Sequence, residues 1–184
     1  MKALKNERFS HHGKYFHIPE MSIRPRPYAD FRGRLYGAAI SPESAEIMAK
    51  LGIGVLSILQ REWDATVAEI ERYNAFYRDL TGQQPIPPVV AARVIIGDTE
   101  AETKALARKY IGGHWQMADQ HYGISRGDHR GVRGYEHYSK LGEMLKQLDP
   151  EVLTENIINP HVFGTPETCL QRIRLLRDKL RFLE

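Results

Sequence analysis

A helix start with two hydroxyl groups follows directly after a short apolar stretch. Ser41-Pro42-Glu43-Ser44 combines a serine suited to the N-cap, a proline suited to the first helical position and a glutamate in the first turn. The first turn of a helix offers free N–H groups and the positive end of the helix dipole, and both favour an anion. These residues predict either a phosphate site or simple capping of the helix, and the local sequence leaves both open.

A second helix start of the same type lies nearer the carboxyl end of the chain. Thr165-Pro166-Glu167-Thr168 follows Gly164, a residue type that lets a ligand approach the backbone. The same two interpretations apply, ligand contact or capping. The likeness of the two tetrapeptides reflects shared capping chemistry and is no proof of an internal repeat.

Three arginines, Arg126, Arg130 and Arg133, lie in a glycine-containing segment. Residues 119–137 carry no apolar stripe, and a long loop of this kind inside an α/β domain is usually functional or mobile. Guanidinium groups on a mobile loop can close over a bound anion. We expect a lid whose arginines contact an anionic substrate or cofactor, with a solvated basic loop as the alternative.

The other reactive residue types predict no further site. The eight histidines lack carboxylates at ligand spacing, so no metal site is expected, and His121, His129 and His137 are interpreted as solvated loop residues. The single cysteine, Cys169, excludes an internal disulfide framework and a cysteine-rich metal site. It falls in the first turn of a predicted helix, where we expect a buried structural thiol.

The elements that must position these residues alternate between strands and helices. Strands are predicted at 34–40, 53–59 and 89–96, with a weaker one near 161–164. Helices are predicted at 41–51, 65–81, 99–118, 135–148 and from 165 to the carboxyl end. Gly82 is predicted to end the second of them, and Thr99-Glu100-Ala101-Glu102 to open the third as a capping box. This alternation predicts an α/β fold of βαβ units with a parallel sheet.

Length and composition support one folded domain over residues 1–184. We expect a connector at 1–33, three βα units at 34–118, the mobile insertion loop at 119–137 and helices at 138–184. A net charge of +3 lacks the basic excess of a dedicated nucleic-acid binder. The sequence has neither a secretory leader nor an apolar run of the roughly 20 residues that cross a membrane, so a cytoplasmic protein is expected.

Several segments, taken in order, resemble the central to C-terminal part of the bacterial luciferase-like monooxygenases. They are FSHHGKYF (9–16), RPRPY (24–28), AAISPESA (38–45), GIGVL (52–56), GDTEAE (97–102), GYEHY (134–138) and FGTPE (163–167). The resemblance implies an oxidoreductase with a (β/α)₈ TIM barrel that holds FMN or, in some branches, the deazaflavin F420. In such a barrel the reduced flavin reacts with O₂ to oxygenate a small organic substrate.

The resemblance also assigns roles to particular residues. The strand at 34–40 corresponds to barrel strand five, and Ala39, Ser41 and Ser44 to positions that hold the flavin. The loop at 119–137 corresponds to a mobile active-site insertion, with the three arginines as its lid. The segments that supply the family's catalytic residues precede this region, so no catalytic residue is assigned.

Length limits how much of such a barrel the chain can form. A complete barrel takes about 250 residues, so we expect a partial barrel that lacks the N-terminal strands and the closing strand. Exposed sheet edges favour association, which predicts a homo-oligomer. The alternative is a truncated, non-catalytic α/β protein that self-associates or binds a partner, with weak or no flavin binding.

Overall fold

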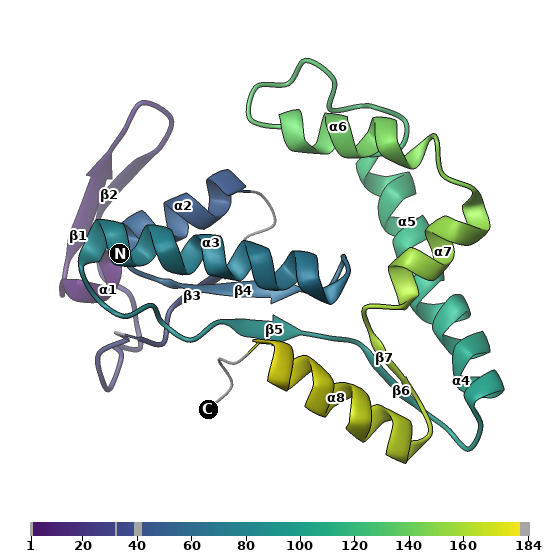
Figure 1. Cartoon of the computed structure of the whole chain (residues 1–184). Coiled ribbons are helices and arrows are strands. Elements are labelled where there is room, and N and C mark those ends of the chain that lie inside the picture. The colour runs from purple at the N-terminus through teal and green to yellow at the C-terminus, as the bar shows by residue number, and fades with distance from the viewer. Residues whose placement is uncertain (1, 32, 39–41, 181–184) are drawn as a thin grey trace. The chain divides into compact units, whose positions relative to one another are not determined.

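The computed structural model describes residues 2–31, 33–38 and 42–180. The chain divides into two compact units, Met1–Leu35 and Tyr36–Glu184, and each is described by itself. Figure 1 labels the helices and strands of both units. Within the described residues, no helix is long and apolar enough to cross a membrane.

The first unit is built on an antiparallel hairpin. Helix α1 (Lys2–Lys5) precedes strands β1 (Phe9–His12) and β2 (His17–Met21). The turn between the strands is closed by Gly13, whose N–H donates to the carbonyl of Phe16 at 2.8 Å. The sequence predicted an ordered connector here, because strands this short carry little periodicity.

The second unit contains two sheets of parallel strands, as the βαβ order predicted. In the first, β3 (Tyr36–Ala38), β4 (Gly54–Ile58) and β5 (Val89–Ala91) pair in the order β3-β4-β5. In the second, β6 (Val94–Ile96) pairs with β7 (Val162–Gly164), the predicted weaker strand. The predicted strand at 89–96 is therefore two strands, separated at residues 92–93.

Helices connect and flank these strands. They are α2 (Pro42–Leu51), α3 (Trp63–Thr81), α4 (Glu100–Ala107), the π-helix η1 (Arg108–Gly112), α5 (Gly113–Tyr122), α6 (Glu136–Leu145), α7 (Pro150–Ile158) and α8 (Pro166–Leu180). The predicted cap of α4 is confirmed, since Thr99 Oγ1 accepts from Glu102 N at 3.2 Å. Gly82 ends α3 with a φ of 66°, as predicted. Helix α7 was not predicted, although Asp149-Pro150 is a good helix start.

Two helices cover one face of the three-stranded sheet. Val55 of β4 packs with Ala49 of α2 and with Tyr73 and Tyr77 of α3. Because side chains alternate along a strand, the opposite face carries Tyr36, Ile58 and Val89. The two helices thus cover one face of the sheet and leave side chains on the other face partly exposed.

Helix α8 is fixed to the start of α3 by the half-buried side chain of Arg172. The Arg172 guanidinium lies between Trp63 and Phe163, 5.3 and 5.4 Å from their ring centroids. Arg172 Nη2 donates to the carbonyl of His161 at 2.9 Å, and Trp63 Nε1 donates to that of Pro160 at 2.8 Å. These contacts join the start of α3, the start of β7 and the middle of α8.

His161, which precedes β7, is almost completely buried, with 1% of its surface exposed. Its Nδ1 accepts from the backbone N–H of Arg93 at 3.2 Å. Burial, and then the nearby Arg93 guanidinium, lower the pKa of His161 to about 4. The imidazole is therefore neutral at physiological pH.

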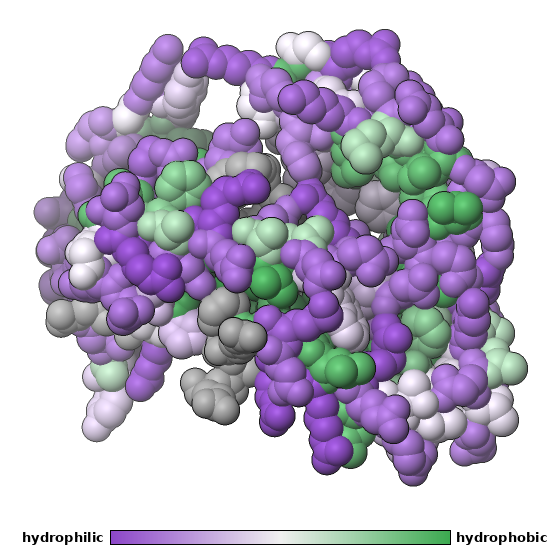
Figure 2. Space-filling view, viewed as in Figure 1, coloured by the Kyte–Doolittle hydropathy of each residue, from purple (hydrophilic) through white to green (hydrophobic). Residues whose placement is uncertain are grey.

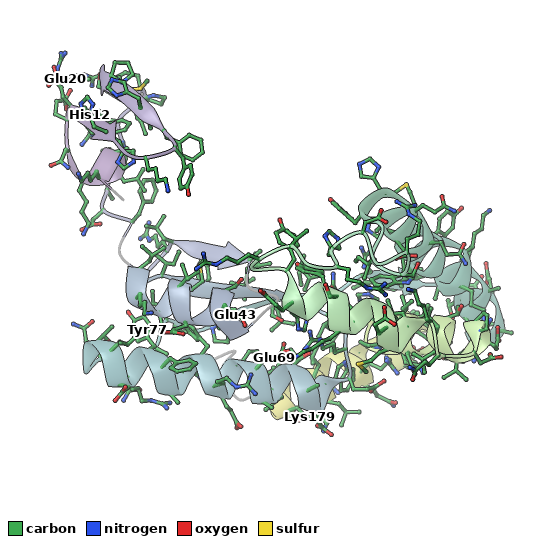
Figure 3. The ribbon with its side chains drawn as sticks, turned by 90° about the horizontal axis from the view of Figure 1, so that it is seen from above. His12, Glu20, Glu43, Glu69, Tyr77 and Lys179 are labelled. Atoms are coloured by element: carbon green, nitrogen blue, oxygen red, sulfur yellow. The ribbon has the colours of Figure 1, made fainter. Side chains whose placement is uncertain are left out.

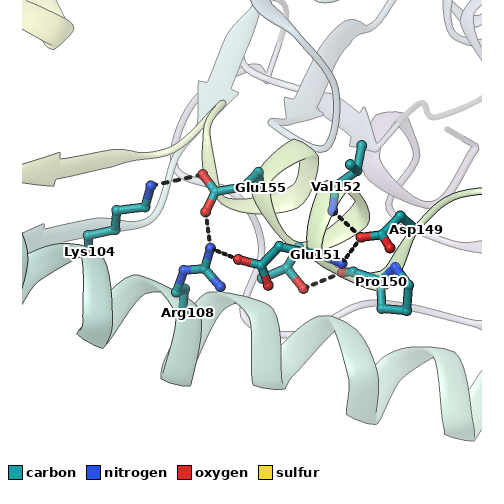
Figure 4. Close-up of polar contacts among 8 residues, drawn as sticks. Lys104, Arg108, Asp149, Pro150, Glu151, Val152 and Glu155 are labelled. Carbon is teal, nitrogen blue, oxygen red and sulfur yellow. Dashed lines mark hydrogen bonds and ion pairs between the residues drawn. The ribbon is translucent and has the colours of Figure 1, made fainter.

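Helix α7 is held against the long α4–η1–α5 segment by a charged network (Figure 4). Arg108 of η1 pairs with Glu151 and Glu155 of α7, and Lys104 of α4 pairs with Glu155 at 3.2 Å. The hydrogen bond from Arg108 is the largest cause of the lowered pKa of Glu151. The network holds α7, the element that directly precedes β7, against this segment.

Candidate functional site

The start of α2 lies where the sequence predicted an anion site. Helix α2 follows β3, the edge strand of the three-stranded parallel sheet, so its first turn is at the carboxyl end of that strand. Ser44 lies in this first turn and is half-buried. Ala39 and Ser41 lie outside the described residues, so their predicted flavin contacts remain predictions.

A cluster of three charged or titratable side chains lies at the carboxyl end of β4, the neighbouring strand. Arg61 follows β4 and pairs through Nη1 with Glu69 of α3. Its Nη2 lies 2.8 Å from Nε2 of His137 at the start of α6. Because a guanidinium only donates, Nε2 of His137 is the acceptor and its proton is on Nδ1. Glu69, which Figure 3 labels on α3, completes the cluster.

The electrostatics of this cluster connect it with the start of α2. Burial is the largest cause of the lowered pKa of His137, and the Arg61 guanidinium lowers it further. The carboxylates of Glu43 and Glu69 act in the opposite direction. Since Glu43 belongs to the first turn of α2, His137 lies within electrostatic range of the predicted phosphate site.

This arrangement brings together residues that sequence reasoning separated or missed. His137 was interpreted as a solvated loop residue, yet it is half-buried and hydrogen-bonded. Arg61 and Glu69 were not selected. A signal for Arg61 was present, because ligand sites in parallel α/β sheets lie just beyond the carboxyl ends of the strands.

The predicted lid arginines are exposed, and two of them pair with carboxylates of the chain. Arg126 pairs with Asp128 at 2.8 Å, and Arg130 pairs with Glu143 of α6. Hydrogen bonds from Arg126 lower the pKa of Asp128. Arg133 is also exposed. Contact of these arginines with a bound anion remains a prediction.

The segment that carries these arginines is folded into turns. Helix α5 continues to Tyr122, beyond its predicted end near residue 118. The carboxylate of Asp119 then accepts from the N–H of Ser125 at 2.8 Å and from its hydroxyl. Gly142 of α6 lies so close to the carbonyl of Ile124 that a Cβ there would clash with it. The turns therefore pack directly on α6.

The second helix start holds an anion from the chain itself. Glu100 Oε1 accepts from the N–H of Thr165 at 3.1 Å and from the hydroxyl of Thr168 at 2.7 Å. The hydrogen bond from Thr168, above all, lowers the pKa of Glu100. This carboxylate occupies the place that a ligand anion would take, which supports the capping interpretation for the start of α8.

The cysteine of the chain is buried, and the described residues contain no larger group of metal-ligating side chains. Cys169 is buried, as predicted, and its Sγ lies 3.5 Å from the carbonyl of Gly164. Burial raises the pKa of its thiol. Among the described residues, no group of three or more histidine, cysteine, aspartate or glutamate side chains is arranged to hold a metal ion.

Comparison with known proteins identifies relatives. A family model described as luciferase-like monooxygenase matches residues 1–180. No curated protein matches the chain. Solved structures share the fold: the oxygenating constituent of 3,6-diketocamphane monooxygenase from Pseudomonas putida, in complex with FMN, is 22% identical, with a TM-score of 0.55 over 97% of this chain and 51% of that one.

Two further solved structures extend the likeness. EDTA monooxygenase from Chelativorans sp. BNC1 is 17% identical, with a TM-score of 0.59 over 94% of this chain and 43% of that one. An F420-dependent secondary alcohol dehydrogenase, in complex with an F420-acetone adduct, is 13% identical, with a TM-score of 0.62 over 97% and 49%. The chain thus spans about half the length of these structures.

Proposed function

Because the chain belongs to the luciferase-like monooxygenase family, we propose that it binds the phosphate of a flavin at the start of α2. The observation that carries the proposal is the position of α2 directly after a parallel edge strand, with the Arg61, Glu69 and His137 cluster nearby. The cofactor is FMN or F420, which two of the similar structures are described as containing. With FMN, the function is oxygenation of a small organic substrate by O₂, for which the reduced flavin supplies the electrons.

The residues at the start of α2 fit a phosphate group. N–H groups of a first helical turn and a serine hydroxyl are donors, and donors are what a phosphate requires. Ser44 supplies such a hydroxyl, and Ser41 precedes the helix by one residue. The guanidinium of Arg61 adds positive charge near this region, partly balanced by Glu69.

The chain's own residues would bind and orient the cofactor. The flavin supplies the redox chemistry when bound, while the protein orients it and excludes water. Ser41 and Ser44 hold the phosphate, and Ala39 is a further cofactor-binding residue of the proposed site. His137 keeps its proton on Nδ1 and receives the Arg61 hydrogen bond on Nε2, which fixes the direction of the guanidinium. The loop arginines Arg126, Arg130 and Arg133 close over the bound anion.

A fluorescence titration with FMN and with F420 tests this proposal. We expect the wild-type chain to bind one of the two flavins, and Ser41→Ala/Ser44→Ala to bind it roughly tenfold more weakly, since a hydrogen bond to a charged group contributes about 1.5–3 kcal/mol. Thr165→Ala/Thr168→Ala is the matched control, because Glu100 already occupies that helix start. Binding that is unchanged in the serine variant, or lost only in the threonine variant, contradicts the proposal.

A second candidate function is self-association, in which two copies of the chain pack together. On the sheet face opposite α2 and α3, Tyr36, Ile58 and Val89 are 37%, 39% and 39% exposed. Figure 2 shows other hydrophobic side chains in separate groups on a mostly hydrophilic face. We propose that the parallel strands form part of a (β/α)₈ barrel and that apolar strand faces of two copies pack together.

Light scattering on the full chain measures this association. We expect a homodimer in the wild type and a monomer in Ile58→Glu, which places a charge on the exposed strand face. The control is Ile47→Glu on α2, also exposed but on a helix. A wild-type monomer, or equal effects of both substitutions, contradicts this second candidate.

A further inference from the structure

We propose that the β1–β2 hairpin binds a divalent transition-metal ion of the Cu²⁺ or Ni²⁺ class through His12 and His17. This site belongs to the first unit and uses no residue of the flavin site proposed above. It is a chelate of two protein ligands, with the remaining coordination positions taken by water.

The backbone places the two histidines opposite each other. His12 is the last residue of β1 and His17 the first of β2, and the two are register partners in the antiparallel pair. Directly opposed residues have Cβ atoms about 4.5–5.5 Å apart and side chains on the same face of the hairpin. The short turn, closed by the Gly13 to Phe16 hydrogen bond, holds this separation.

The side chains bring two metal-binding nitrogen atoms together. Nδ1 of His12 lies 3.0 Å from Nδ1 of His17, and the ring centroids are 4.2 Å apart with an interplanar angle of 73°. Without a metal, one Nδ1 must donate a proton to the other. With both rings protonated on Nε2 instead, both Nδ1 atoms can donate a lone pair to one ion.

The nitrogen separation selects the class of metal. Imidazole nitrogens bind such ions at about 2.0–2.1 Å, so two of them 3.0 Å apart subtend an angle of roughly 91–97° at the metal. That angle matches neighbouring positions of a square-planar or tetragonal ion, the preference of Cu²⁺ and Ni²⁺. A tetrahedral Zn²⁺ site would need about 3.3 Å between the nitrogens.

The neighbouring histidine does not belong to the chelate. His11 is the next residue of β1, so its side chain starts from the opposite face of the strand, and its register partner is Ile18. Its ring lies against Gly13, where a Cβ would come within 3.3 Å of its carbon atoms. His11 therefore serves as a matched control with the same residue type and a similar exposed position.

Calorimetric titration of the metal-free full chain with CuCl₂ and NiCl₂ in a non-coordinating buffer tests the site. We expect one equivalent of Cu²⁺ to bind the wild type and the His11→Gln variant equally. His12→Gln and His17→Gln should each bind Cu²⁺ at least roughly tenfold more weakly, because each variant leaves a single ligand in place of a chelate. Equal affinity in all variants, or a loss in His11→Gln alone, overturns the proposal.

The electron paramagnetic resonance spectrum of the Cu²⁺ complex provides the second measurement. We expect a tetragonal signal with coupling to two imidazole nitrogens in the wild type and to one in either variant. Thermal melts monitored by circular dichroism establish that the variants fold. A wild-type spectrum with a single coordinated nitrogen, or tighter binding of Zn²⁺ than of Cu²⁺, overturns the assignment.

Discussion

Nη2 of Arg61 and Nε2 of His137 lie 2.8 Å apart, although the two residues are separated by 76 positions in the chain. The contact joins the segment after β4 to the first turn of α6, which in turn packs on the turns that carry the loop arginines. Packing of α6, and of the turns that carry the loop arginines, is therefore linked to the protonation of the His137 imidazole.

Acidification should release α6. Burial and Arg61 lower the pKa of His137, so between the folded and unfolded pKa values the unfolded segment binds more protons. Docking of α6 is thus fully stabilised above about pH 6.5 and weakens as the pH falls below it. Lys140 acts with Arg61, whereas Glu43 and Glu69 oppose the shift.

Hydrogen exchange of residues 136–145 at a series of pH values measures this release. We expect protection to fall on acidification in the wild type and to stay nearly constant in His137→Gln, since an amide oxygen can accept from Arg61 without titrating. The control is His121→Gln on α5, whose ring contacts the neighbouring Tyr122. The same pH dependence in His137→Gln and the wild type would show that another group controls docking.

Global stability should also fall in acid because of His161. Its pKa of about 4 in the folded state lies below the ordinary value of 6.5, so its contribution is complete above pH 6.5 and is lost as the pH falls towards 4. We expect a loss on the order of 1–3 kcal/mol across this window. Urea titrations at several pH values measure it, and His161→Gln should show a flatter profile. An equally steep profile in that variant contradicts the prediction.

Two glycine substitutions should have opposite effects. Gly142→Ala places a Cβ against the carbonyl of Ile124 and should cost about 1–3 kcal/mol of unfolding free energy. Gly113→Ala lies in a helix with nothing within 4 Å of the new Cβ and should stabilise by about 0.5–1 kcal/mol. Denaturant titrations compare the two. A neutral Gly142→Ala would show that α6 does not pack on this turn.

Trp63→Phe should destabilise the second unit by about 1–2 kcal/mol. The substitution removes the 2.8 Å hydrogen bond to the carbonyl of Pro160 and weakens the contact between Arg172 and the aromatic ring. Trp115→Phe on α5 is the control. Urea unfolding measures both variants, and equal effects would contradict a specific role for the Trp63 indole.

Local sequence signals predicted much of the fold because their causes are local. Thr99 and Gly82 act through their own backbone neighbourhood: Thr99 caps the start of α4 and Gly82 ends α3, as expected. The 92–93 break could not be predicted in this way, because it depends on β5 pairing with β4 and β6 with β7. The hairpin of β1 and β2 likewise depends on pairing between two short strands.

The candidate site was predictable only in part, for the same physical reason. The start of α2 carries its signal in four consecutive residues. The contact between Arg61 and His137 depends on how α6 packs within the second unit, and no local pattern encodes it. The starts of α2 and α8 look alike in sequence, but they differ in the structure. The start of α8 already holds the carboxylate of Glu100, which lies 65 positions before Thr165 in the chain.

The most direct test of the central claim is a comparison of FMN with riboflavin, which lacks the phosphate, by fluorescence titration of the wild type and of Ser41→Ala/Ser44→Ala. The account predicts that the wild type binds FMN more tightly than riboflavin and that the double substitution lowers the affinity for FMN to that for riboflavin, leaving riboflavin binding unchanged. Equal affinity of the wild type for the two flavins, or an equal loss for both in the variant, would contradict a phosphate site at the start of α2.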